Sequence, residues 1–256
     1  MKRLLAVVAS LVLFFGANAD AEVKSLSIGV DEWPPYEFKM GYSGNEHISG
    51  FSTEVVEAVL KKMGVAIAEI RQYPWARAEK MLIDGYIDLL LTAATSEKRA
   101  TLTYYPSESL VESAWVFYIR KQDEGKIVFN TLKDLKGKRI GVVRAYTYTQ
   151  DFWDFVKAEK SFEEVPNDDI NIKKLLANRL DVIIMDRGNG HALLKRLGAS
   201  GQVLALKKPL MTMSLYSIFS RNSDVDKDFV DQYSSVLKTF KSTPEYRALY
   251  DKYFVN

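Results

Sequence analysis

Two hydrophobic spacings alternate along the first part of this chain. Short apolar runs are typical of buried strands, and apolar residues repeating every three or four positions are typical of amphipathic helices. Ser52 is the expected N-cap of the first helix, which we expect to end at Gly64. The pattern predicts strands at 25–31, 66–73 and 87–91, and helices at 52–64 and 74–85.

The same alternation returns in the second part of the chain. It predicts a short turn and a strand within 132–145, helices at 149–160, 168–180 and 191–198, and strands at 180–186 and 202–206. Strands that alternate with helices indicate an α/β fold with mostly parallel sheets.

Two segments resemble each other, "DGYIDLLLTAAT" at 84–95 and "ANRLDVIIMDRG" at 177–188. Each follows a predicted helix and places an aspartate, Asp88 or Asp181, directly before an apolar run. This internal repeat predicts two α/β lobes of related design.

The lobes are expected to be joined by two crossings of the chain. The apolar segments 113–119 and 214–219 are the expected crossings, after which two amphipathic helices pack back on the first lobe. The first lobe would then comprise residues 20–118 and 215–256, with the second lobe, 119–214, inserted.

The N-terminus has the pattern of a secretory signal peptide. Lys2 and Arg3 precede an apolar run, and the small residues of "ANA" end at Ala19, the expected cleavage site. A cut after Ala21 is the alternative. The run is shorter than the roughly 20 residues of a spanning helix, and no second long run follows. We therefore expect a soluble periplasmic protein.

The charge and the cysteine content of the chain limit the partners and the kinds of site that it can have. The chain has 35 Lys and Arg against 33 Asp and Glu, and Lys2 and Arg3 account for the excess. The mature protein is then neutral, so nothing favours nucleic acid or an anionic membrane as partner. The chain has no cysteine, which excludes disulfides, thiolate metal sites and cysteine nucleophiles.

In open α/β sheets, ligands bind at the carboxyl ends of strands. Arg99 follows the hydroxyl residues that end the third strand and could hold a carboxylate through paired hydrogen bonds. Asp186 ends "VIIMD" and could take an ammonium group. Alternatively, Arg99 is a solvated surface residue and Asp186 caps the next helix. A buried zwitterion would need both partners.

Aromatic residues follow the first strand. Trp33 to Tyr36 form a stiff turn that could cover an apolar or cationic side chain, or could simply pack locally. Trp75 and Arg77 have the same two interpretations.

The motifs, taken together, resemble bacterial extracellular solute-binding proteins of family 3, the periplasmic receptors of amino-acid ABC importers. They are "IGVDEWPPYEF", "GFSTEVVEAVLKKMG", "GYIDLLLTAATSEKR" followed by "YYPS", "DLKGKRIGVVRA" and "RLDVIIMD". The resemblance implies a two-lobed type II periplasmic-binding fold and hinge closure on a small ligand. It also implies delivery to a membrane permease by a protein that is not an enzyme and is expected to be monomeric.

The resemblance also implies roles for individual residues. Arg99, six residues before Tyr105, would hold the ligand carboxylate, Thr147 would assist it, and Asp186 would hold the amino group. The implied side-chain and hydroxyl contacts are Asp31, Trp33 or Tyr36, and Thr92.

The chain departs from the family pattern at two positions. Ala94 stands where the family usually has a hydroxyl residue, and Ala145 where it usually has glycine. Arg77, Arg144 and Tyr146, expected near the cleft, would favour an acidic or otherwise anionic ligand.

Two other functions remain alternatives. A few proteins with this fold are dehydratase-like enzymes, but His47 and His191, the chain's two histidines, form no recognisable nucleophile–base pattern. A ligand-presenting sensory protein is the other alternative. We expect no cofactor. We also expect no metal, because "DVDKD" at 224–228 lacks the glycine and closing acid of a calcium loop.

Overall fold

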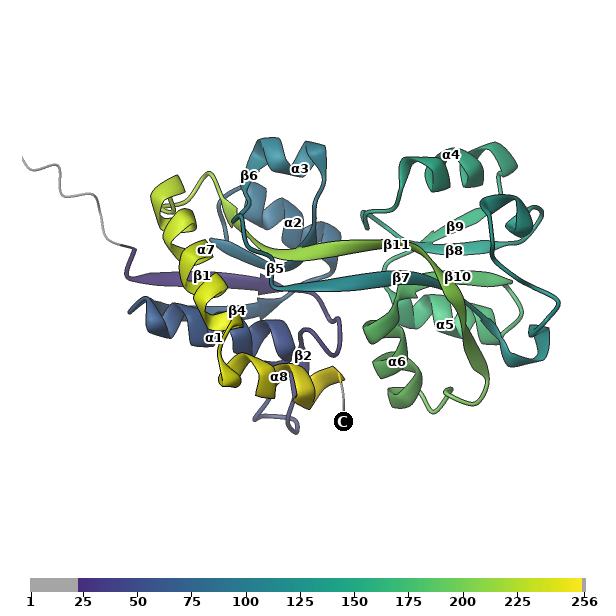
Figure 1. Ribbon diagram of the computed structural model, residues 1–256, viewed down its shortest axis with the longest axis horizontal. Helices are drawn as coiled ribbons and strands as arrows, with labels where there is room; N and C mark the ends of the chain where they lie inside the picture. Colours follow the sequence, from purple (N-terminus) through teal and green to yellow (C-terminus); the bar gives the residue numbers. More distant parts are fainter. Residues whose placement is uncertain (1–22, 255–256) are drawn as a thin grey trace, which may run out of the picture.

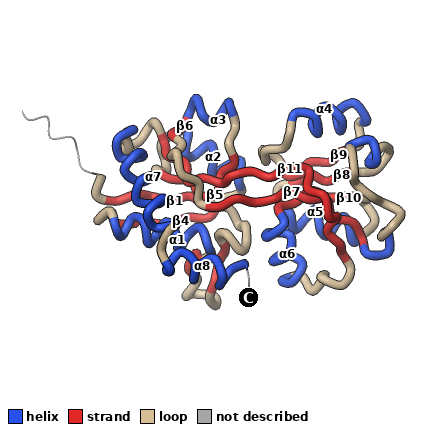
Figure 2. Tube along the Cα trace, in the orientation of Figure 1, coloured by secondary structure: helices blue, strands red, loops and turns tan. Residues whose placement is uncertain are grey.

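The computed structural model describes residues 23–254, so the predicted leader lies outside the described residues. Figures 1 and 2 show two α/β lobes connected by a pair of long strands. The strands are β1 (Ser25–Val30), β2 (Phe38–Met40), β3 (His47–Ser49), β4 (Ala66–Gln72), β5 (Leu89–Ala94), β6 (Thr103–Tyr104), β7 (Val111–Arg120), β8 (Ile140–Val143), β9 (Phe162–Val165), β10 (Val182–Asp186) and β11 (Val203–Ser220). The helices are α1 (Phe51–Lys62), α2 (Trp75–Ile83), α3 (Glu97–Leu102), α4 (Gln150–Glu159), α5 (Asp168–Leu176), α6 (Arg187–Arg196), α7 (Lys227–Lys241) and α8 (Pro244–Phe254), with 3₁₀ turns at Lys121–Asp123 and Leu132–Leu135.

The strands form one continuous sheet that passes through both lobes. Its order is β4-β1-β5-β11-β7-β10-β8-β9, with β6 beside β11, and β2 and β3 pair separately as a hairpin. The strands β4, β1 and β5 are parallel to one another, as are β10, β8 and β9. The strands β11 and β7 pair antiparallel between these two groups. The lobes therefore share two crossing strands.

The two lobes repeat one topology, as the internal sequence repeat predicted. In each lobe the first parallel strand is central, the second lies at the edge, and the third lies beside the crossing strands. Asp88 and Asp181 precede the third strands β5 and β10. Asp88 Oδ2 accepts from the Ser27 amide at 2.7 Å, and Asp181 Oδ2 accepts from the Arg139 amide at 2.9 Å. Each aspartate thus fastens the third strand to the central strand.

Helices cover both faces of the sheet in each lobe (Figure 1). In the first lobe, α1, α7 and α8 pack together on one face, and α2 packs against β1 and β5 on the other. Helix α1 begins after Gly50, whose φ of 128° and close approach to the Tyr36 carbonyl exclude a side chain there. Ser52, the expected N-cap, is instead buried in the first turn of the helix.

Two segments differ from the expected elements. The strands expected at 202–206 and 214–219 are parts of a single strand, β11, with register shifts against β7 near Pro209. The apolar pattern is interrupted there because the middle of the crossing strand is only partly buried. The strand β9 has only one fully buried residue, Val165, which explains why no apolar run predicted it.

No helix between residues 23 and 254 is long and apolar enough to cross a membrane.

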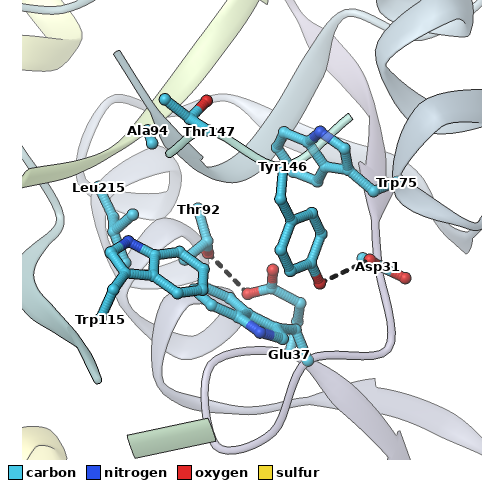
Figure 3. A pocket seen from close by; sticks show the side chains of 10 residues that line it. Asp31, Glu37, Trp75, Thr92, Ala94, Trp115, Tyr146, Thr147 and Leu215 are labelled. Carbon is cyan, nitrogen blue, oxygen red and sulfur yellow. Dashed lines mark hydrogen bonds between the residues drawn. The ribbon is translucent and has the colours of Figure 1, made fainter. Parts of the chain in front are cut away.

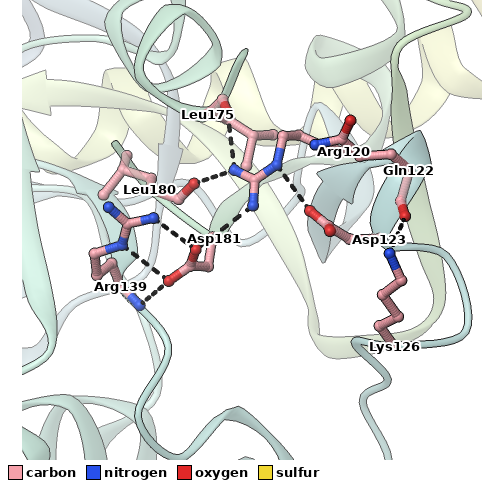
Figure 4. Close-up of polar contacts among 8 residues, drawn as sticks. All are labelled: Arg120, Gln122, Asp123, Lys126, Arg139, Leu175, Leu180 and Asp181. Carbon is pink, nitrogen blue, oxygen red and sulfur yellow. Dashed lines mark hydrogen bonds and ion pairs between the residues drawn. The ribbon is translucent and has the colours of Figure 1, made fainter. Parts of the chain in front are cut away.

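A partly exposed ion-pair network lies at the start of β10 (Figure 4). Arg120, which is buried, donates to the Leu175 carbonyl at 3.0 Å and also bonds the Leu180 carbonyl. Arg120 Nη2 lies 3.5 Å from Asp181 Oδ1, and Arg139 Nη2 lies 2.8 Å from the same oxygen. Hydrogen bonds from Arg139 lower the pKa of Asp181 to about 2.

The depressed pKa of Asp181 predicts an acid-dependent contribution to stability. This contribution is complete above the ordinary carboxyl pKa of about 4 and is lost as the pH falls toward 2. The loss of unfolding free energy in Asp181→Asn should therefore be largest above pH 4 and should shrink below it. Urea unfolding at several pH values measures this difference, with the exposed Asp224→Asn as control. A pH-independent difference would contradict the prediction.

Candidate functional site

A cavity lies between the lobes, where strands from both lobes end (Figure 3). Residues that follow β1 and β8, the end of β5, and the crossing strands β7 and β11 contribute to its wall. The lining residues are Asp31, Trp33, Glu37, Trp75, Thr92, Ala94, Trp115, Tyr146, Thr147 and Leu215. The lining thus includes four aromatic residues and two carboxyl groups, and no lysine or arginine of residues 23–254 belongs to it.

A tight turn after β1 places two side chains in the cavity wall and directs a third toward the second lobe. The Trp33 amide donates to the Glu37 carbonyl at 2.7 Å, and the Tyr36 amide donates to the Trp33 carbonyl at 2.9 Å. Trp33 and Glu37 line the cavity, whereas Tyr36 reaches across to the second lobe. The stiff aromatic turn predicted from the sequence is thus part of the cavity wall.

One residue that lines the cavity, and one next to the lining, have left-handed backbone conformations. Thr92 has φ 57° and Ala145 has φ 63°, values that are unfavourable for residues with a Cβ. Such strained positions cluster at ligand sites, where the surrounding structure holds them. Thr92 ends one wall of the cavity, and Ala145 directly precedes the two lining residues Tyr146 and Thr147.

The aromatic rings form a connected group around the cavity. Trp33 stacks on Trp115 with centroids 5.7 Å apart, and on Tyr36 at 4.6 Å. Tyr146 meets Trp33 and Trp75 edge-on, each at 6.3 Å, and Trp115 at 5.8 Å. Aromatic faces of this kind attract flat apolar groups and cations.

Two buried carboxyl groups line the cavity. Burial raises the pKa of Asp31 to about 6, although the Glu32 amide donates to Oδ1 at 2.7 Å. Burial also raises the pKa of Glu37 well above its ordinary value. The Thr92 hydroxyl donates to Glu37 Oε2 at 2.7 Å, as Figure 3 shows.

Two more carboxyl groups are buried nearby in the second lobe. Asp186 is fully buried and caps α6, since its Oδ1 accepts from the Asn189 amide at 2.8 Å and from the Tyr36 hydroxyl at 3.1 Å. Burial raises the pKa of Asp186 to about 7. Burial and the charges of Asp31 and Asp186 raise the pKa of Asp168 well above its ordinary value. Among residues 23–254, Asp186 Oδ2 and both Asp168 oxygens have no hydrogen-bond partner.

Arg99 is buried behind the cavity wall and does not line it. Its Nε donates to Glu79 Oε1 at 2.7 Å, and its Nη1 donates to the Ala94 carbonyl at 2.6 Å. The guanidinium also lies over the ring of Trp75, 5.3 Å from its centroid. In the part of the chain that the structure describes, the side-chain hydrogen bonds of Arg99 come from Nε and Nη1 and not from Nη2.

The other residues expected at the site fall into two groups. Thr92, Ala94, Tyr146 and Thr147 line the cavity together with Asp31 and Trp33. Arg77 and Arg144 are exposed and do not line it. The Arg77 guanidinium lies over the ring of Tyr73, 5.3 Å from its centroid.

Contacts between the lobes close the cavity. Asn189 Nδ2 donates to the Pro34 carbonyl at 2.7 Å, and the hydrogen bond between Tyr36 and Asp186 also joins the two lobes. At the surface, Arg196 Nη1 lies 2.7 Å from Glu32 Oε1 of the first lobe, and its Nη2 lies 2.7 Å from Asp169 of its own lobe. The lobes are therefore in contact around the cleft.

Glu37, Trp115 and Asp168 were not singled out by the sequence. Trp115 lies in an apolar run that reads as an ordinary buried strand. Asp168 directly follows the N-cap of α5, where an acidic residue is usual. For Glu37 the sequence does contain one indication of a place in the site, because Glu37 directly follows the rigid turn that includes Trp33 and Tyr36.

The described residues contain no group of three or more histidine or acidic side chains placed to hold a metal ion.

Comparison with known families identifies the chain. The family of bacterial extracellular solute-binding proteins, family 3, matches residues 26–256. The chain belongs to this family, which confirms the resemblance seen in its motifs, and it is a solute-binding protein. The fold is the type II periplasmic-binding fold that the sequence predicted.

Individual relatives are distant. The chain is 25% identical to the "Probable histidine-binding protein" of Campylobacter jejuni over 92% of this chain and 88% of that protein. It is 28% identical to the "Arginine-binding extracellular protein ArtP" of Bacillus subtilis over 55% of each. A solved structure described as an ancestral arginine-binding protein bound to arginine matches with a TM-score of 0.76 at 22% identity, covering 90% of this chain and 98% of that one. A histidine kinase sensor domain matches with a TM-score of 0.77 at 19% identity, covering 90% and 96%. The structural matches establish the fold alone.

The raised pKa of Asp186 predicts how stability depends on pH in the ligand-free protein. A carboxyl group that holds its proton more tightly when folded stabilises the protein at low pH, and this stabilisation is lost as the pH rises from about 4 to about 7. Asp186→Asn keeps the helix cap but cannot ionise. Its unfolding free energy should therefore rise relative to the wild type across this interval. Thermal or urea unfolding from pH 4 to pH 8 measures the difference, and a constant difference would show that Asp186 does not titrate in this range.

Proposed function

We propose that this chain is a periplasmic binding protein that captures a cationic amino acid between its lobes and delivers it to an ABC importer. The observation that carries the proposal is the composition of the interlobe cavity, in which Asp31 and Glu37 lie among Trp33, Trp75 and Trp115. A cation over an aromatic face gains about 0.5–2 kcal/mol, and a buried carboxylate adds a direct counter-charge. Two relatives with names that specify histidine and arginine agree with this choice.

The ligand's positively charged side chain is assigned to Asp31 and the indole rings. Arg99 Nη2, behind the cavity wall, is the donor for the carboxylate, and the Thr147 hydroxyl in the wall is the second donor. Asp186 Oδ2, buried and without a partner in residues 23–254, is the acceptor for the α-amino group. Burying both ends of a zwitterion requires such partners, because an unpaired buried charge is very costly.

An anionic ligand fits this cavity poorly. The arginines that suggested one, Arg77 and Arg144, are exposed and lie outside the lining. A second carboxylate would instead meet the carboxyl groups of Asp31 and Glu37. The proposal therefore gives the site the opposite charge preference from the one expected from the sequence, and it includes no catalytic step.

Calorimetric titration with three ligands tests the charge preference. L-Arginine should bind, and L-glutamate should not, because its side chain would face Asp31. Agmatine, which is arginine without its carboxylate, should bind more weakly than arginine because the Arg99 contact is missing. Tighter binding of glutamate than of arginine would contradict the proposal.

Replacement of Asp31 tests the cation contact. Asp31→Asn keeps the shape of the side chain but removes the counter-charge, so arginine should bind about 30-fold more weakly or worse, which corresponds to about 2 kcal/mol or more. The exposed Asp224→Asn is the matched control and should bind like the wild type. Equal affinities of the Asp31 and Asp224 variants would remove Asp31 from the site.

Replacement of Arg99 tests the carboxylate contact. Arg99→Ala should weaken arginine binding by a similar factor but should leave agmatine affinity nearly unchanged, since agmatine has no carboxylate to lose. Circular dichroism should show that the variant remains folded. An equal loss for both ligands would mean that Arg99 acts on the structure of the cleft and does not contact the carboxylate.

A further inference from the structure

The ring of Tyr146 occupies the space between the tryptophans of the cavity (Figure 3). It meets Trp33, Trp75 and Trp115 edge-on, with centroids 5.8–6.3 Å apart. Its hydroxyl donates to Asp31 Oδ2 at 3.4 Å. Tyr146, a residue of the protein itself, thus already makes the aromatic and carboxylate contacts that the cavity offers to a ligand side chain.

Tyr146 reaches these partners from the opposite lobe. Trp33, Trp75 and Asp31 belong to the first lobe, whereas Tyr146 follows β8 of the second lobe. Its backbone is fixed by a turn in which the Tyr146 amide donates to the Val143 carbonyl at 3.2 Å and Ala145 has a left-handed conformation. The ring is therefore held in the cleft by a defined turn, and it bridges the two lobes.

The space left beside Tyr146 is small. The cavity volume is about 30 Å³, which accommodates about one or two water molecules. An amino acid with a long cationic side chain needs far more room than this. A ligand that uses Trp33, Trp75 and Asp31 must therefore displace the ring of Tyr146.

We propose that Tyr146 is an internal competitor for the ligand's side-chain subsite. The ring holds the lobes together before ligand binds, and the ligand must replace its contacts with the tryptophans and Asp31. Tyr146 would then determine specificity, because only a ligand with both a flat or apolar stem and a cationic end replaces these contacts. The assignment of the subsite rests on the proposed function, but the lobe-bridging role of the ring does not.

The bridging role is tested without any ligand. Small-angle X-ray scattering of the ligand-free protein should give a larger radius of gyration for Tyr146→Ala than for the wild type, because the lobes lose their central contact. Tyr86→Ala, which removes a 71% exposed tyrosine of the first lobe, is the matched control and should leave the radius unchanged. An unchanged radius for Tyr146→Ala in a folded protein would overturn the proposal.

The competition is tested by calorimetry with L-arginine. Tyr146→Ala should bind arginine about tenfold more tightly than the wild type, because a site that is occupied part of the time has a reduced apparent affinity. Tyr146→Phe keeps the ring but loses the bond to Asp31, so its affinity should also rise, by a smaller factor. This second variant keeps the test valid if the alanine variant folds poorly.

The outcomes separate the two proposals. Weaker arginine binding by both Tyr146 variants would show that the ring contacts the ligand, and would overturn the competitor role. If the wild type and both variants bind no cationic amino acid, the proposed function fails, and the scattering result still decides whether Tyr146 bridges the lobes.

Discussion

Four buried carboxyl groups, Asp31, Glu37, Asp168 and Asp186, set the physical character of this protein. None of them forms a salt bridge among residues 23–254, and burial raises the pKa of each. A buried carboxylate without a counter-charge is costly, so the protein must keep these groups protonated, supply hydrogen bonds, or acquire a cation. Hydroxyl groups from Thr92, Tyr36 and Tyr146 provide part of this compensation. Among residues 23–254, Glu37 Oε1, Asp186 Oδ2 and both Asp168 oxygens remain without a hydrogen-bond partner.

The scaffold explains why these groups meet. Each lobe places its central and third strands with their carboxyl ends toward the other lobe, and Asp88 and Asp181 fasten those strands at the opposite ends. The crossing strands β7 and β11 connect the lobes through one continuous sheet. Opening of the cleft therefore requires bending of two paired strands, while the contacts of Tyr36 and Asn189 across the cleft oppose it.

The sequence predicts the scaffold better than the side-chain partnerships. Alternating apolar spacing predicted the α/β fold, and the matching positions of Asp88 and Asp181 predicted the repeat, because both depend on local pattern. The pairing of Arg99 with Glu79 depends on how α2 packs beside α3, which no local pattern records. Asp168 has the ordinary place of an acidic residue in a first helical turn, and only the tertiary structure buries it. Gly50 and not Ser52 is the N-cap of α1, and the Tyr36 backbone, which lies against Gly50, comes close only in the folded chain.

The two ends of the proposed site offer a ligand different contacts, and this difference affects which ligands the site can select. At the carboxylate end, Ala94 offers no hydroxyl, Thr92 donates to Glu37, and Arg99 is shared with Glu79 and the Ala94 carbonyl. At the other end, Asp31 and three indole rings surround the space that Tyr146 fills. Under the proposed function, discrimination between ligands must then come mainly from the cationic side chain. The α-carboxylate, common to all amino acids, would add affinity through Nη2 of Arg99 but would distinguish none of them.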